Sequence, residues 1–261
     1  MRLRVWILLA AAAAAIVVVF LFPAIPQNEA YHNFADQRPL LGIANCLNVI
    51  SNAPFLFIGL AGMGIALRGT RTGENLFVDA SEGWPWLAFF AGVALTAFGS
   101  AWYHHRPDDR TLVWDRIPMT VGFMSLVAAV VAERIRVRAG VRLLLPLIAL
   151  GVGSVIYWDV TQARGHGDLR PYAIAQFGSL LVLVLLFALF PPRYTRSLDF
   201  VVALAFYGIA KLFEAADKFV FAAGHIVSGH TIKHLFAALS TYWILRMLRL
   251  RDPIRAQSAG S

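Results

Sequence analysis

Residues 171–190 read PYAIAQFGSLLVLVLLFALF, a run of twenty residues without a charged side chain. A helix needs about 20 mainly apolar residues to cross the hydrocarbon core of a bilayer. Similar runs recur along the chain, and they predict eight spans near 5–22, 42–67, 84–104, 111–132, 141–158, 171–190, 198–220 and 230–248. The predicted fold is therefore all-α: a polytopic membrane protein with a seven-transmembrane-helix bundle and one further N-terminal hydrophobic helix.

The composition agrees with a membrane protein and argues against other classes. Hydrophobic residues make up 59% of the 261 residues and charged residues 15%, whereas soluble domains have roughly 45–50% and 25%. The net charge of +8 does not indicate a nucleic-acid partner, because the arginines lie in short loops and at the C-terminus rather than along one stripe. The single cysteine, Cys46, excludes an intrachain disulfide and a thiolate zinc cluster.

The runs divide the chain into four segments. These are an N-terminal hydrophobic helix (1–23), a non-cytoplasmic connector (24–41), a seven-helix domain (42–249) and a cytoplasmic polar tail (250–261). With the N-terminus in the cytoplasm, fourteen arginines fall on the cytoplasmic side and five on the other, as the positive-inside rule requires. The first helix is either a retained signal anchor or a cleaved signal peptide. Both alternatives leave the C-terminus inside, in a plasma membrane or bacterial inner membrane.

Five polar residues stand near the ends of three predicted spans. Ser100 and His104 are four residues apart, as are His230 and His234, so each pair shares one face of a helix. Asp115 opens the span that follows His104. The predicted topology places His104, Asp115, His230 and His234 at one depth on the non-cytoplasmic side. Because ionisable groups within a membrane are costly, they usually mark a functional site.

These residue types are those of a catalytic zinc site. Three histidines, His104, His230 and His234, can supply the three ligands that leave a fourth position open. Asp115 is the candidate general base and acid, and Ser100 can donate a hydrogen bond to a developing oxyanion. Less specific interpretations exist: an HxxxH pair arises often by chance, His105 competes with His104, and Asp115 can form a structural ion pair with Arg116.

Two further groups of polar or aromatic residues lie near the same side of the membrane. Tyr157 and Trp158 are candidate substrate-binding residues, although aromatic residues also form ordinary interfacial belts. Lys211, Glu214 and Lys218 have helical spacing and predict a paired charge network, with headgroup recognition as the alternative.

The sequence resembles the alkaline ceramidase family, within the wider superfamily of membrane hydrolases that includes the adiponectin-receptor group, as a divergent, bacterial-type member. The matching segments run from about residue 45 to the last span. They are Asn48-Val-Ile-Ser-Asn52-Ala-Pro-Phe, Gly99-Ser-Ala-Trp-Tyr-His104, Asp115-Arg-Ile-Pro-Met119 and His230-Thr-Ile-Lys-His234. The resemblance implies one Zn²⁺ on His104, His230 and His234, with Asp115 and Ser100 beside it. It also implies hydrolysis of the amide bond of N-acyl sphingoid lipids to a fatty acid and a sphingoid base.

The chain departs from that family at one place. Asn45 stands where a glutamate of the family's acidic calcium cluster is expected, and this departure argues against a calcium site. The expected partner is a ceramide-like membrane lipid, with no nucleic acid and no obligate protein partner. Two alternatives stay open: an esterase or lipase acting on another membrane lipid, and a non-enzymatic receptor in which the metal only stabilises the fold.

Overall fold

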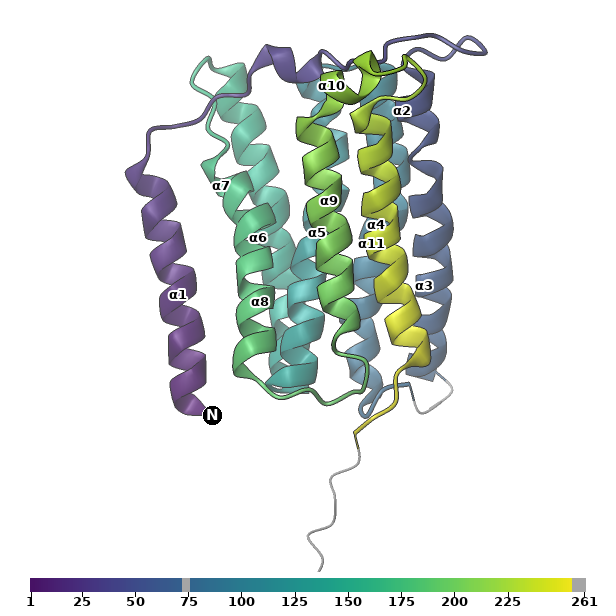
Figure 1. Ribbon diagram of the computed structural model, residues 1–261. Helices are drawn as coiled ribbons and strands as arrows, with labels where there is room; N and C mark the ends of the chain where they lie inside the picture. The colour runs from purple at the N-terminus through teal and green to yellow at the C-terminus, as the bar shows by residue number, and fades with distance from the viewer. Residues whose placement is uncertain (72–75, 255–261) are drawn as a thin grey trace, which may run out of the picture.

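The computed structural model describes residues 1–71 and 76–254, and within these residues it is helical with no β-strand. Figure 1 shows the long helices running roughly side by side as one bundle. The helices are α1 (Arg2–Leu21), α2 (Cys46–Ile50), α3 (Ala53–Arg71), α4 (Gly83–His105), α5 (Asp109–Arg134), α6 (Val137–Ala163), α7 (Arg170–Ala173), α8 (Ser179–Leu189), α9 (Asp199–Ala215), α10 (Asp217–Ala222) and α11 (Gly229–Leu250). The all-α fold is thus confirmed.

Six of the predicted spans correspond to helices that are long and apolar enough to cross a membrane. They are Arg2–Leu21, Cys46–Arg71, Ala80–His105, Asp109–Arg134, Val137–Ala163 and Arg170–Leu189. α9 does not reach this standard because its 17 residues extend only about 26 Å, and α11 carries polar and charged side chains among its 22 residues. The chain is consistent with an integral multi-pass membrane protein, while the seven-span count stays a prediction.

Small residues set the spacing between consecutive helices. α3, α4, α5 and α6 pack in sequence order, and α11 packs on α9 and α3. A Cβ on Gly99 would collide with the Trp114 carbonyl oxygen, and a Cβ on Gly92 would collide with Gly122, so α4 and α5 touch backbone to backbone. Glycine at these positions permits the close approach that helices in membranes favour.

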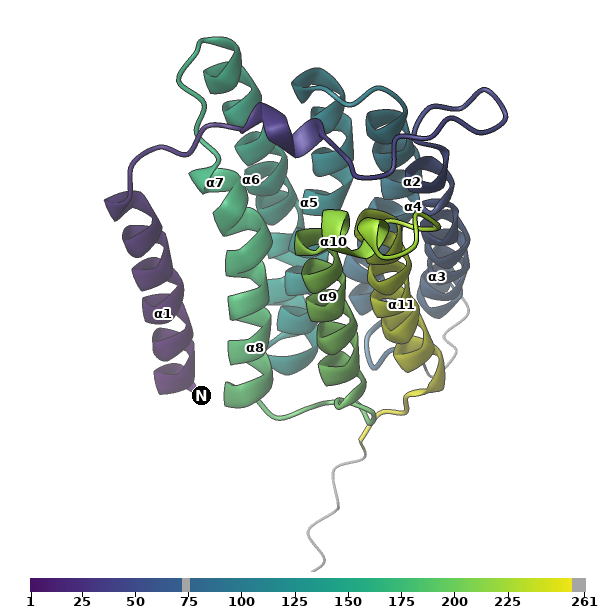
Figure 2. The same ribbon diagram turned by 45° about the horizontal axis from the view of Figure 1, so that its top comes forward.

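α1 stands at the edge of the bundle beside α8 (Figure 1), and Leu8 is its one buried residue. The start of α1 and the end of α11 lie at the same end of the bundle. This placement agrees with a chain that crosses the membrane an even number of times from the start of α1 to the end of α11. Figure 2 shows that the segment between α1 and α2 runs across the opposite end of the bundle. This segment corresponds to the connector predicted at residues 24–41.

A buried polar cluster holds the end of the bundle where α11 finishes. Arg251 donates to Glu133 at 2.6 Å, and the Trp86 indole donates to the same carboxylate oxygen at 2.8 Å. The Tyr194 hydroxyl donates to Glu82 at 2.6 Å. Residues 251–254 of the predicted tail run beside Tyr194; residues 255–261 lie outside the described residues.

Candidate metal centre

α4 and α11 bring the three histidines together at the connector end of the bundle. His104 lies in the last turn of α4, and His230 and His234 lie in the first two turns of α11. The start of α11 is fixed by Ser228, whose hydroxyl accepts from the Thr231 amide at 3.1 Å. Asp217 of α10 accepts from the His230 amide at 2.8 Å. His104 is fully buried, whereas His105 is only partly buried. Of these two neighbouring histidines, His104 is therefore the one that belongs to the site.

Two of the three pairs of ring nitrogens have the spacing of zinc ligands, and the ligand atoms of all three histidines lie within 4.8 Å of one another. The Nε2 atom of His104 lies 3.1 Å from that of His234 and 3.3 Å from that of His230. Two nitrogens bound at about 2.0–2.1 Å to one tetrahedral zinc lie roughly 3.3 Å apart. Each ring is at most 5% exposed, and three neutral imidazoles cannot satisfy one another's nitrogens at a single point. The buried triad can therefore bind a metal ion, and its all-nitrogen set and spacing fit Zn²⁺.

A hydrogen-bonded chain behind His234 selects the tautomer that a metal needs. The Ser51 hydroxyl donates to the Asn48 carbonyl at 3.1 Å, and its oxygen lies 2.7 Å from His234 Nδ1. With the hydroxyl proton on that carbonyl, the Ser51 oxygen can accept from Nδ1–H, and the Nε2 lone pair is then available to a metal. Such outer partners orient metal-binding histidines. Ser51, which directly follows α2, thus connects this segment to α11 through His234.

Asn48 connects three segments around the site. Its side-chain oxygen accepts from Thr231 at 2.8 Å and from Ser228 at 3.3 Å, and its amide donates to the Asp36 carbonyl at 3.2 Å. Asn48 is completely buried. The α2 helix, the connector and α11 are therefore held at the distance that the histidine triad requires.

The connector covers the outer side of the triad. The Phe34 ring lies 4.7 Å from the His104 ring and 4.6 Å from the His230 ring, measured between centroids. Asn45, in the left-handed conformation, donates its side-chain amide to the His104 carbonyl at 2.8 Å. Sequence reasoning missed the role of Phe34. The aromatic residues of an otherwise polar connector were the available signal.

Asp36 and Asn45 lie in the region where the ceramidase family carries its acidic calcium cluster. The Asp36 carboxylate receives two hydrogen bonds from the Arg38 guanidinium, each 2.8 Å long. This contact holds the pKa of Asp36 below its usual value. Both side chains thus have protein partners of their own.

Ser100 and Asp115 lie together in the wall of a large cavity. Both residues are buried. They line a cavity of about 490 Å³ that they share with His234. The rest of its wall is mainly apolar and includes Phe89, Val93, Leu126, Leu183, Phe187, Leu204 and Ile244. A mainly apolar lining with a few polar groups is typical of a site for a small molecule.

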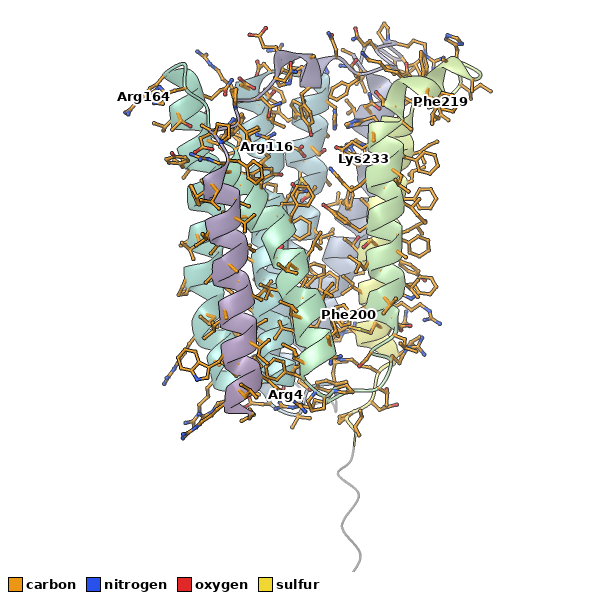
Figure 3. The ribbon with its side chains drawn as sticks, turned by 60° about the vertical axis from the view of Figure 1, so that its left-hand side comes forward. Arg4, Arg116, Arg164, Phe200, Phe219 and Lys233 are labelled. Carbon is orange, nitrogen blue, oxygen red and sulfur yellow. The ribbon has the colours of Figure 1, made fainter. Side chains whose placement is uncertain are left out.

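The cavity reaches the outer surface of the bundle between α8 and α9. These helices follow one another in sequence, but α8 packs on α5 while α9 packs on α11. Val184 of α8 and Val201 and Leu204 of α9 line the cavity and are also 40% or more exposed. Figure 3 shows Lys233 toward the connector end of the bundle and Phe200 nearer its other end, and both residues line the cavity.

Lys233 is a cavity residue that sequence reasoning missed. It lies between the two α11 histidines and lines the cavity, and its Nζ contacts Glu214 Oε1 at 3.0 Å. Glu214 also pairs with Lys211, whereas Lys218 is exposed. The predicted charge network therefore exists around Glu214. Its second lysine is Lys233 of α11, and not Lys218, which the helical spacing had indicated. Spacing along one helix could not show a partner on another helix.

Arg116, Tyr157 and Trp158 lie away from the cavity lining. Arg116 directs its guanidinium toward Gln27 and Trp158, so the considered ion pair with Asp115 does not form. Tyr157 is 46% exposed and Trp158 is fully buried. Neither Tyr157 nor Trp158 is among the described residues that line the cavity. The structure does not bring them to the histidines.

Fold and site together define an all-helical bundle with membrane-spanning character and a buried three-histidine site that can bind a metal ion. No model of a known protein family matches the sequence, and a search of curated proteins gives no match.

Proposed function

We propose that the protein is a zinc-dependent intramembrane hydrolase that cleaves the amide bond of ceramide-like N-acyl sphingoid lipids. One observation carries the proposal: three imidazole nitrogens converge, and one of the three histidines, His234, lines a mainly apolar cavity whose wall also holds Ser100 and Asp115. A purely structural metal would need neither a cavity nor a carboxylate beside it. The resemblance to alkaline ceramidases supplies the amide and the sphingoid lipid.

Zinc bound to the three nitrogens would polarise a carbonyl group and acidify water. Asp115 would take a proton from the attacking water and return it to the leaving amine, so that the C–N bond breaks after the C–O bond has formed. Ser100 is buried in the same cavity wall as Asp115. The oxyanion role expected for Ser100 stays a prediction.

The opening between α8 and α9 suits a substrate that comes from the bilayer. Exposed apolar residues line it on both sides, so acyl chains can pass without entering water. The arginine distribution supports a site near the non-cytoplasmic face. We therefore propose that the lipid substrate enters laterally from the outer leaflet and binds with its amide group next to Asp115.

The test is turnover of N-acyl sphingoid lipids by purified protein, with zinc content measured on the same samples. His230→Ala should lose both zinc and turnover. Asp115→Asn should keep zinc and lose turnover by roughly 10²–10⁴-fold. Asp109→Asn is the matched control, because Asp109 is also an acid near the start of α5 but contacts His32 instead. Turnover that survives Asp115→Asn would refute the mechanism, and bound zinc without turnover of any amide or ester would favour a structural metal.

A further inference from the structure

The histidine triad has two sides, and the cavity meets one of them. His234 lines the cavity, whereas His104 and His230 are not among the described residues that line it. On the other side, the Phe34 ring lies against both of these histidines and is only 5% exposed. A metal ion can therefore reach the three nitrogens either through the cavity or past Phe34.

The cavity is an unfavourable route for a metal ion. Its wall is mainly apolar, and it opens between α8 and α9, where Val184 and Leu204 are exposed. A cation loses its hydration in such surroundings at a large cost in free energy, and charges within the hydrocarbon of a bilayer are expensive. The connector end of the bundle is the end that meets water in the predicted topology, so a hydrated divalent cation arrives there.

Residues 33–38 of the connector, here called the strap, separate the triad from that end. Figure 2 shows the connector crossing the end of the bundle as a single stretch of chain. Asn33 and Gln37 are exposed, whereas Phe34 and Asp36 are buried. The strap contains neither helix nor strand, so side chains rather than a backbone ladder hold it in place. Such segments open at a lower cost in free energy than packed helices do.

Two side chains tie the strap to the segments around α11. Asp217 accepts from the Ala35 amide at 2.9 Å with one carboxylate oxygen and from the His230 amide at 2.8 Å with the other. Arg38 donates to two backbone carbonyls of the loop before α11, those of residues 225 and 226, at 2.7 and 2.8 Å. The acceptors of Arg38 lie outside the triad, so this tie can break and form again without moving a metal ligand.

We propose that the strap is the gate through which a metal ion enters and leaves the triad, with Phe34 as the side chain that closes it and Arg38 as the tie that keeps it shut. When the strap is closed, the Phe34 ring excludes water from the outer side of His104 and His230. When it opens, the two rings are uncovered toward water. The gate needs a metal ion at the triad, but it does not depend on the proposed hydrolysis.

The experiment measures the rates of zinc binding and zinc release by the purified full-length protein in neutral detergent. Metal-free protein is mixed rapidly with Zn²⁺ in the presence of a chromogenic indicator, and zinc-loaded protein is mixed with an excess of chelator. Arg38→Met should raise both rates roughly 3- to 10-fold, because two hydrogen bonds no longer hold the strap closed. The Kd for zinc should change little, because both rates rise together. Faster release without faster binding would indicate a weakened metal site instead of an open gate, and it would overturn the proposal.

Arg170→Met is the matched control. Arg170 pairs with Asp168, two residues before it, as Arg38 pairs with Asp36. Its guanidinium also donates to a backbone carbonyl, that of Phe22, at 2.6 Å. This contact lies just before the connector and away from the strap, so Arg170→Met should bind and release zinc at the wild-type rates.

Phe34→Ala tests the closing side chain directly. Removing the ring should raise both rates at least as much as Arg38→Met does, and Phe34→Ala carries the test if Arg38→Met does not fold. Unchanged binding rates in these variants would overturn the gate. A rise in Arg170→Met as large as that in Arg38→Met would overturn it as well.

The same preparations separate the gate from the proposed hydrolysis. Lipid turnover by the wild type, together with unchanged zinc-binding rates in the variants, would overturn only the gate. Faster zinc exchange in the variants, without turnover of any amide or ester lipid by the wild type, would overturn the enzyme and leave the gate in place.

Discussion

Replacing Ser51 by alanine tests the metal centre without touching a metal ligand. The Ser51 oxygen is the acceptor for His234 Nδ1–H at 2.7 Å, and both residues are buried. In the alanine variant, His234 keeps its Nε2 atom but loses the partner that holds the proton on Nδ1. The ring can then move its proton to Nε2, which the metal must displace.

The size of the effect follows from the burial of this bond. A buried donor left without an acceptor costs about 1–3 kcal/mol. The cost falls on the metal-bound form, because only that form requires the proton on Nδ1. Zinc binding should therefore weaken roughly 5- to 150-fold, a range that includes the effect of about 10–100-fold typical of partners behind metal ligands.

The assay is competition for zinc between the purified protein and a chromogenic chelator, followed by zinc analysis after dialysis. Ser125→Ala is the matched control, because Ser125 is also buried and its hydroxyl has no partner among the described residues. Its zinc affinity should equal that of the wild type. A Ser51→Ala variant that binds zinc within about twofold of wild type would refute the reasoning about the tautomer.

Three further results are expected. Asn48→Ala should lower the free energy of unfolding by about 1–3 kcal/mol, measured by denaturant titration, because its buried hydroxyl and carbonyl partners lose their bonds. Gly99→Ala should lower Tm and turnover because its Cβ would collide with the α5 backbone, whereas Gly153→Ala, with open space around its Cβ, should not lower either. For pH, the Arg38 contact lowers the pKa of Asp36, so ionised Asp36 stabilises the fold above its unfolded pKa and this contribution disappears as pH falls through the folded value. The Tm difference between wild type and Asp36→Asn should shrink below about pH 4, and a difference that grows there would contradict the assignment.

The helices could be predicted closely because apolar runs are a local property. The predicted spans 84–104 and 111–132 correspond to α4 and α5 with ends that differ by one or two residues. The predicted span 42–67 was less accurate, since the chain interrupts the helix at Ser51 and Asn52 to direct polar groups at α11. A hydropathy profile cannot detect such a break, because it averages over a window of about 20 residues and two polar residues change that average little.

For the site, residue type and spacing were enough to select His104, His230 and His234, since a pair four residues apart on a helix must share a face. Spacing could not reveal that Lys233 pairs with Glu214 or that Phe34 covers the histidines. Each of these depends on residues far apart in the sequence.

The sequence by itself thus determined an all-helical, membrane-compatible chain and the identity of its candidate metal ligands, because both are written in local composition and helical periodicity. The tertiary structure decided which hydroxyl lies against His234, where the cavity opens between α8 and α9, and which lysine of α11 pairs with Glu214. These depend on distances between separate helices, and packing alone sets such distances.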